Sequence, residues 1–286
     1  MKKKAAVMFV GGQSNAHAHN QVMEEQDRIY EPLQNVFSLD RKENQSFDIT
    51  DVVWSGYTTE GKNLGESQDH TYTLASFVAK RWQKAIEEGA DLPDLYIVQI
   101  SIGSQGIING MWNPDKERVL KPGKLGVADI ALFDLATHVY PLAMANLKKQ
   151  GLEPVVVGFH WLGCEQEVWN ETYLRADMQS RYDAFFDAMT GAIGEACPMY
   201  LYQLQLQEFC KKHEIPQEAV AIINGAMEKQ CHRYPGSTFV RLDQCPHWDP
   251  TDEHKGVYAK DNGHYLAKTQ AWFADRFWKD LEKIHW

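Results

Sequence analysis

The amino-acid sequence predicts an α/β fold: a three-layer α/β/α sandwich around a five-stranded, mainly parallel sheet. Two observations support this prediction. Short apolar runs rich in β-branched residues recur along the chain, and longer segments with helical periodicity separate them. Strands that alternate with helices usually form parallel sheets, because each crossover helix returns the chain to the edge where the preceding strand began and covers one face of the sheet.

The strands are expected where the apolar runs are too short for helices. The first run is Ala5–Val10, which ends at a pair of glycines. The other four are Leu95–Ile102, Pro154–Trp161, Met199–Leu206 and Thr238–Leu242. A further short run at Asn35–Leu39 could add another strand.

The helices are expected where apolar residues recur every three or four positions. Within 74–85, the side chains of Leu74, Phe77, Val78 and Trp82 form one apolar stripe, as in a half-buried helix. Similar patterns fill Ala128–Leu147, Tyr173–Ile193 and Gln217–Cys231, and a final helix is expected from about His264 to Ile284.

The length of 286 residues allows one large domain or two small ones. Two stretches, 41–69 and 104–127, are rich in Gly, Asn, Asp, Ser and Lys, and they lack helical or strand periodicity. Loops this long usually have a function or are disordered, and ligands of open α/β sheets bind at the carboxyl ends of strands. No linker composition separates two halves. We therefore expect a single domain, residues 1–286, with these two long loops on its active face.

The charge balance argues against polyanionic partners. Lys and Arg number 29 and Asp and Glu 39, for a net charge of −10, so neither nucleic acid nor an anionic membrane surface is expected to bind. The apolar start at Ala5–Val10 is too short for a signal-peptide core or a membrane span. The five cysteines, an odd number without a Cys-x-x-Cys pair, suggest free thiols. We expect a cytoplasmic protein without a metal or organic cofactor, and the pattern leaves its oligomeric state open.

The segment Gly11-Gly12-Gln13-Ser14-Asn15 closes the first predicted strand. Two glycines allow a tight turn from strand to helix, which would place Ser14 at a helix N-terminus. Unpaired backbone N–H groups and the helix dipole favour developing negative charge there. This position suits a nucleophile, although a serine that only caps the helix would fit the same segment.

A serine nucleophile needs a base, and the base needs an orienting acid. Asp261 and His264 have the one Asp-x-x-His spacing in the chain, at the start of the last predicted helix. Residues three apart lie on one helix face, so the carboxylate could hold one imidazole nitrogen while the other faces outward. The alternative for this pair is a capping Asp beside a surface His.

These motifs together resemble the SGNH hydrolases, and more narrowly their sialate O-acetylesterase and acetylxylan esterase branch, carbohydrate esterase family 6. The resemblance rests on Gly-Gln-Ser-Asn at 12–15, a Gly-containing block at 102–107, Trp161-x-x-x-Glu165, and Asp-x-x-His-Tyr at 261–265. It runs from Val10 to about Phe277. It implies a serine esterase that removes O-acetyl groups from a small-molecule or oligosaccharide substrate through an acyl-enzyme, without a cofactor.

The resemblance also implies a role for each matched residue. Ser14 corresponds to the nucleophile, His264 to the general base and Asp261 to its orienting acid. The backbone N–H groups of Ser14 and Gly103 correspond to oxyanion donors. The residues implied to support the site or bind substrate are Gln13, Asn15, Gln105, Trp112, Gly163 and Glu165.

One block departs from the family pattern Trp-His-Gln-Gly-Glu-Ser-Asp. Gly163 stands where the family has Gln, a side-chain oxyanion donor, and Cys164 replaces the following Gly. Losing one such donor costs about 10²–10³ in rate, unless Gln105, Gln166 or a backbone N–H at Gly163 replaces it. Two alternatives therefore stay open: a carbohydrate-binding relative with weakened catalysis, and a short-chain lipase or thioesterase with the same triad.

Other residue pairs suggest weaker hypotheses. Glu165 and Glu167 could form the paired carboxylates of a glycosidase, and Cys164 with His160 could form a thiol nucleophile and its base. Several aromatic residues in predicted loops could stack on a sugar ring, although packing is the more common role for each alone: Trp54, Tyr57, Trp112 and Trp248.

Overall fold

The computed structural model describes residues 2–17, 23–39, 47–48, 52–60, 72–115, 124–125, 131–249, 251, 256–259, 263–284 and 286. Asp261 lies outside these residues.

The structure contains a seven-stranded sheet in the order β4-β2-β5-β1-β7-β8-β9. All neighbouring strands are parallel except β4, which pairs antiparallel with β2. The α/β prediction is confirmed, but the predicted number of five strands is wrong. The strands are β1 (Lys4–Gly12), β2 (Val36–Leu39), β4 (Trp54–Gly56), β5 (Asp94–Ser101), β7 (Glu153–Leu162), β8 (Met199–Tyr202) and β9 (Thr238–Val240).

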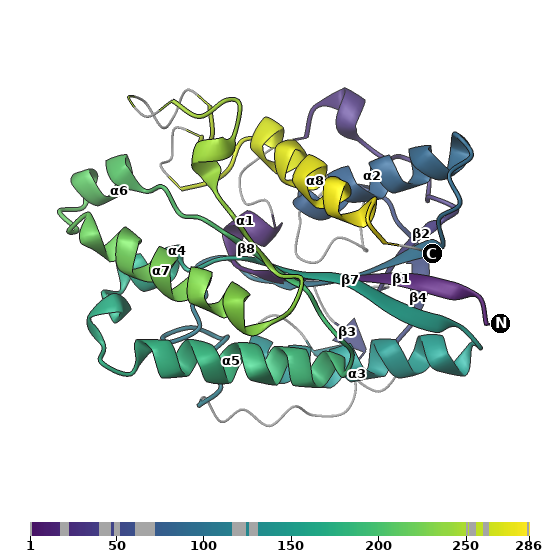
Figure 1. The fold of residues 1–286 in the computed structure, drawn as a ribbon, viewed down its shortest axis with the longest axis horizontal. Helices are drawn as coiled ribbons and strands as arrows, with labels where there is room; N and C mark the ends of the chain where they lie inside the picture. Colours follow the sequence, from purple (N-terminus) through teal and green to yellow (C-terminus); the bar gives the residue numbers. More distant parts are fainter. Residues whose placement is uncertain are drawn as a thin grey trace.

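Helices cover both faces of the sheet, which gives the three predicted layers (Figure 1). One face carries α2 (Leu74–Glu87) and α8 (Ala267–Leu281), and the other carries α3 (Leu132–Lys149), α5 (Met178–Ile193) and α7 (Glu218–Arg233). Because α8 begins at Ala267, His264 precedes the helix, and the prediction that the last helix starts at about His264 is wrong.

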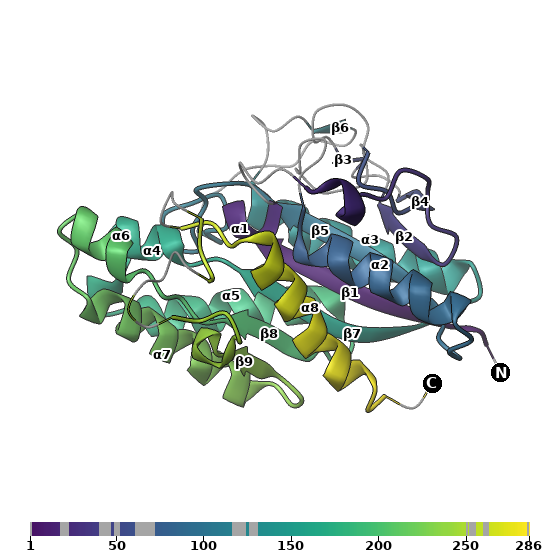
Figure 2. The ribbon, with the colours of Figure 1, turned by 90° about the horizontal axis from the view of Figure 1, so that it is seen from above.

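Short helices gather at one end of the sheet (Figure 2). They are α1 (Ser14–His17), α4 (Glu165–Trp169) and α6 (Gln207–Lys212). Single 3₁₀ turns complete the described helices at η1 (Glu25–Asp27), η3 (Thr172–Leu174) and η4 (Leu242–Gln244). In the described parts of the chain, no helix has both the length and the apolar character that crossing a bilayer requires.

The two long stretches at 41–69 and 104–127 contain more structure than the sequence predicts. β4 lies within the first of them and joins the main sheet. β3 (Phe47–Asp48) from the first stretch pairs antiparallel with β6 (Lys124–Leu125) from the second. The two stretches therefore meet in a small sheet of their own, while much of each lies outside the described residues.

The central strand β1 brings the site together. Its residues Ala5–Val10 have no exposed surface, as expected for a parallel strand covered on both faces. Its last residue, Gly12, lies opposite Ser101 of β5 and Leu162 of β7. The segments that follow these three strands therefore begin side by side at the carboxyl edge of the sheet, where α/β proteins bind ligands.

Candidate active site

The turn that carries Ser14 depends on a glycine. Gly12 has φ +139°, and a Cβ there would lie 2.0 Å from the carbonyl oxygen of Leu162. The next backbone N–H, that of Gln13, donates to the same carbonyl at 3.0 Å. The chain then enters α1 at Ser14, as the sequence predicts, and Ser14 lines a cavity at this edge of the sheet.

Side chains from three other segments hold this turn in place. The Trp112 indole N–H donates to the Gly12 carbonyl at 2.9 Å, and the Gln270 amide donates to the Asn15 carbonyl at 2.9 Å. Gln99 of β5 donates to the Ala16 carbonyl at 2.7 Å. These donors pair with carbonyls of the turn and α1, so the position of Ser14 is fixed from the loop after β5, from β5 and from α8.

Trp112 therefore supports the turn that carries Ser14. Its side chain is fully buried and makes an edge-to-face contact with Trp161, with ring centroids 5.0 Å apart. Tyr57 is also buried, and Trp54 donates to Asn146 of α3. Trp112 and Tyr57 are thus packing residues, which is the alternative to stacking on a sugar, because burial leaves no ring face for a ligand.

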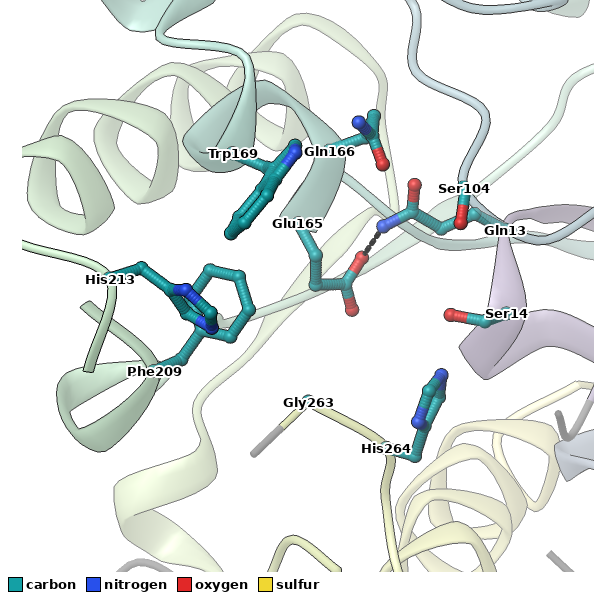
Figure 3. Close-up of a pocket in the computed structure, with 10 residues that line it drawn as sticks. All are labelled: Gln13, Ser14, Ser104, Glu165, Gln166, Trp169, Phe209, His213, Gly263 and His264. Atoms are coloured by element: carbon teal, nitrogen blue, oxygen red, sulfur yellow. Dashed lines mark hydrogen bonds between the residues drawn. The ribbon is translucent and has the colours of Figure 1, made fainter. Parts of the chain in front are cut away.

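Asn15 connects the turn that carries Ser14 to the segment that carries His264. Its side-chain Nδ2 donates to the Gly263 carbonyl at 2.8 Å, and its Oδ1 accepts from the Tyr265 N–H at 2.8 Å. One amide thus holds the peptide groups on both sides of His264, across 250 residues of sequence. The His264 side chain lines the same cavity as Ser14 and lies beside it (Figure 3).

Glu165, the first residue of α4, is the acceptor that holds the residues on either side of Ser14. It accepts hydrogen bonds from the Gln13 side chain and, at 2.7 Å, from Asn15 Nδ2. Burial raises the pKa of Glu165, and the amide hydrogen bonds and His264 partly offset that effect. Gln13, Asn15 and Glu165 thus form one hydrogen-bonded group around Ser14.

Glu167 anchors the segment that contains Gly103. Its Oε1 accepts from the backbone N–H groups of Ile107 at 2.5 Å and Ile108 at 3.3 Å, and its side chain is 1% exposed. Gly106 permits this approach, since a Cβ there would lie 2.4 Å from the same oxygen. Glu165 lines the cavity, whereas Glu167 lies beneath this loop. The paired-carboxylate interpretation of a glycosidase is therefore wrong.

The buried carboxyl of Glu167 should make stability depend on pH. Burial raises its pKa from the ordinary 4.5 to about 7. As pH rises between these values, the unfolded chain loses the proton before the folded chain does. The folded state therefore loses about 3 kcal/mol of stability from this group by pH 8.

We expect Glu167→Gln to remove that part of the pH dependence, because the amide oxygen can still accept from Ile107 and Ile108. Urea unfolding at several pH values between 4.5 and 8 measures it. The measured quantity is the slope of the free energy of unfolding against pH, compared between wild type and variant. A constant energetic cost of the new NH₂ group does not change this slope. Parallel stability curves for the two proteins would contradict the prediction.

Two residues with left-handed backbone follow the strands beside β1. Ser104 after β5 has φ +59°, and Cys164 after β7 has φ +87°. Such conformations favour glycine, so Cys164 holds a backbone conformation that is strained for a residue with a side chain. Cys164 is buried, and this burial raises its pKa well above the usual range.

The hypothesis that Cys164 is a thiol nucleophile with His160 as its base is wrong for two reasons. The first is the burial of Cys164. His160 is also buried, with its Nδ1 2.7 Å from the Tyr202 hydroxyl, and burial lowers its pKa to about 3. Neither Cys164 nor His160 lines the cavity at Ser14.

Three groups were candidates to replace the oxyanion donor Gln of the resembled pattern, and they differ in whether they line the cavity: Gln105, Gln166 and the backbone N–H at Gly163. Gln105 closes its own loop, donating to Gly103 at 3.3 Å and accepting from Met111 at 3.0 Å. Gly163 is buried, and a Cβ there would lie 3.1 Å from the Trp161 indole. Of the three, Gln166 lines the cavity. Gly103 directly precedes the cavity-lining Ser104, and its assignment as a backbone donor stays a prediction.

The cavity itself has a volume of about 330 Å³. Ser14 and His264 lie on one side of it, and Trp169, Phe209 and His213 lie on the other (Figure 3). Sequence reasoning missed these three rings. One signal was present, because Trp169 follows Glu165 by four residues and so shares its helix face. The lining residues are Gln13, Ser14, Ser104, Glu165, Gln166, Trp169, Phe209, His213, Gly263 and His264.

Within the described residues, no group of three or more His, Cys, Asp and Glu side chains is arranged to hold a metal ion.

No protein-family model matches the chain, and no curated protein matches its sequence. Solved structures do match its fold. NanS superposes with a TM-score of 0.61 at 14% identity, over 99% of both chains. A protein from Arabidopsis thaliana superposes with a TM-score of 0.60 at 10% identity, over 98% of this chain and 99% of the other. XAC1771, a carbohydrate acetylesterase from Xanthomonas citri, gives 0.55 at 14% identity, over 96% of this chain and 55% of the other.

The chain therefore has the same fold as these solved structures. The resemblance found in the sequence is thereby confirmed at the level of the fold. At identities of 10–14% the likeness extends no further, so the chemistry of this chain has to be argued from its own site.

Proposed function

We propose that the protein is a serine esterase that removes O-acetyl groups from a carbohydrate. The observation that carries this proposal is the clamp of Asn15, which holds the peptide groups on both sides of His264 next to the turn that presents Ser14. A cavity joins the two side chains. The shared fold with an acetylesterase that acts on carbohydrate supports the same assignment.

In the proposed mechanism, His264 accepts the Ser14 hydroxyl proton as the oxygen attacks the acetyl carbonyl. The N–H groups of Ser14 and Gly103 donate to the oxyanion, and the Gln166 amide takes the place of the family's Gln. His264 then gives its proton to the departing sugar oxygen. Water attacks the acetyl-enzyme as His264 accepts a proton from it, and His264 then returns this proton to the Ser14 oxygen as acetic acid leaves. Asp261 is assigned to stabilise the imidazolium.

Covalent labelling with a fluorophosphonate, combined with hydrolysis of 4-nitrophenyl acetate, tests this proposal. We expect a burst of nitrophenol followed by steady turnover, and a mass increase that peptide mapping assigns to Ser14. Binding of acetylated sugars without labelling or hydrolysis would instead support the alternative of a carbohydrate-binding relative.

The preference for acyl length separates the acetylesterase from the lipase or thioesterase alternative. The cavity of about 330 Å³ must hold both the acyl group and the alcohol, so a long acyl chain competes with the alcohol for space. We expect kcat/KM for 4-nitrophenyl esters to be highest for acetate and to fall about tenfold or more by octanoate. A kcat/KM that rises with chain length would overturn the acetylesterase assignment.

A further inference from the structure

We propose that Trp169, Phe209 and His213 form a subsite for the uncharged sugar ring whose acetyl group reaches Ser14. This inference rests on the proposed function and names its substrate class more narrowly. The subsite and Ser14 line one cavity, on opposite sides of it (Figure 3).

The three rings hold one another in place. Trp169 ends α4, Phe209 lies in α6, and His213 directly follows α6. The His213 ring makes an edge-to-face contact with Trp169, with centroids 4.7 Å apart at 85°, and lies 4.7 Å from Phe209. The centroids of Trp169 and Phe209 are 5.7 Å apart. Trp169 is nevertheless 49% exposed, so much of its surface is open to a ligand.

Such a cluster is suited to a sugar ring. The C–H groups of a pyranose pack on an aromatic face, and its hydroxyls need polar partners at the rim, an arrangement typical of ligand pockets. Gln166 lines the same cavity three residues before Trp169 and can supply such a partner. Ligand pockets measure roughly 300–1,000 Å³, so the 330 Å³ here matches one acetylated ring.

The position of the Glu165 carboxylate indicates that the bound sugar ring carries no negative charge. Its carboxylate lies between Ser14 and the aromatic cluster (Figure 3) and accepts from Gln13 and Asn15. A sugar carboxylate in the same cavity would place two negative charges near each other in a partly desolvated site, where their repulsion is stronger than in water.

The test compares an acetyl ester that has a sugar ring with one that lacks it. The measured quantity is the ratio of kcat/KM for 6-O-acetylglucose to that for ethyl acetate. We expect Trp169→Ala to lower this ratio at least about tenfold relative to wild type. Trp169→Phe should keep the ratio within about threefold of the wild-type value. Leu174→Ala is the matched control, because Leu174 is another large exposed apolar side chain, 70% exposed, and does not line the cavity. It should leave the ratio unchanged.

Failure of the subsite is distinguishable from failure of the esterase assignment. If wild type hydrolyses both esters but Trp169→Ala keeps the ratio, the subsite is wrong and the esterase stands. If wild type hydrolyses neither, NMR titration with 6-O-acetylglucose decides: a shift of the Trp169 indole N–H resonance supports the subsite, and no shift overturns it. An O-acetylated glucuronate hydrolysed as fast as 6-O-acetylglucose would overturn the preference for an uncharged ring.

Discussion

Ser14→Ala is expected to lower kcat/KM for 4-nitrophenyl acetate by about 10⁴-fold or more. Removing the serine of a triad leaves the catalysis that oxyanion donors and binding supply, and the loss is typically of this order. The helix should not suffer, because alanine is the best helix former and Ser14 is the first residue of α1. Steady-state kinetics measure the effect, and circular dichroism with urea unfolding verifies that the variant is folded.

Ser104→Ala is the matched control for the identity of the nucleophile, since Ser104 lines the same cavity. We expect fluorophosphonate labelling to persist in Ser104→Ala and to vanish in Ser14→Ala. Unchanged turnover in Ser14→Ala, or labelling that disappears with Ser104, would show that Ser14 is not the nucleophile.

The elements that were predictable from the sequence are those whose pattern is local. Ala5–Val10 is continuously apolar because β1 is the central strand, buried on both faces, and the Gly-Gly turn after it leads directly to Ser14. β4 was missed because Trp54–Gly56 is three residues long and half-buried. Its strand conformation comes from pairing with Phe37–Leu39, which no local pattern encodes.

The start of α8 shows how a tertiary contact overrides periodicity. The apolar pattern suggests a helix from His264, but the Tyr265 N–H is bound to Asn15 and Tyr265 pairs with Tyr258 in an isolated bridge. These contacts hold the segment out of the helix until Ala267. As a result, His264 lies in a segment that Asn15, next to Ser14, holds in place.

The missed aromatic residues have a similar explanation. Trp169 belongs to a helix of five residues, too short to show periodicity, and Phe209 reaches the cavity from a different helix. Trp112 was expected in a loop, and its indole N–H pairs with a carbonyl 100 residues earlier in the chain, a contact that no local pattern encodes. Contacts of this range determine which aromatic rings face the cavity, and composition cannot report them.

Asn15→Ala is expected to lower kcat about 10²–10³-fold, because it releases the segment that carries His264. The two hydrogen bonds to Gly263 and Tyr265 and the one to Glu165 are lost together. A base displaced by about 1 Å costs about 10²-fold in rate. Stability should fall as well, since each buried group left without a partner costs about 1–3 kcal/mol.

Asn224→Ala separates positioning from stability. Asn224 makes the same kind of clamp elsewhere in the fold: its Oδ1 accepts from the Leu204 N–H and its Nδ2 donates to the Leu204 carbonyl, both at 2.8 Å. It does not line the cavity. Both variants should lower the free energy of unfolding in urea, but kcat should fall only in Asn15→Ala, measured where each protein is fully folded. If the two variants lose stability alike and both keep kcat, Asn15 has no part in positioning His264. A loss of kcat confined to Asn15→Ala would mean that the clamp on the peptide groups flanking His264, and not packing in general, aligns the base with Ser14.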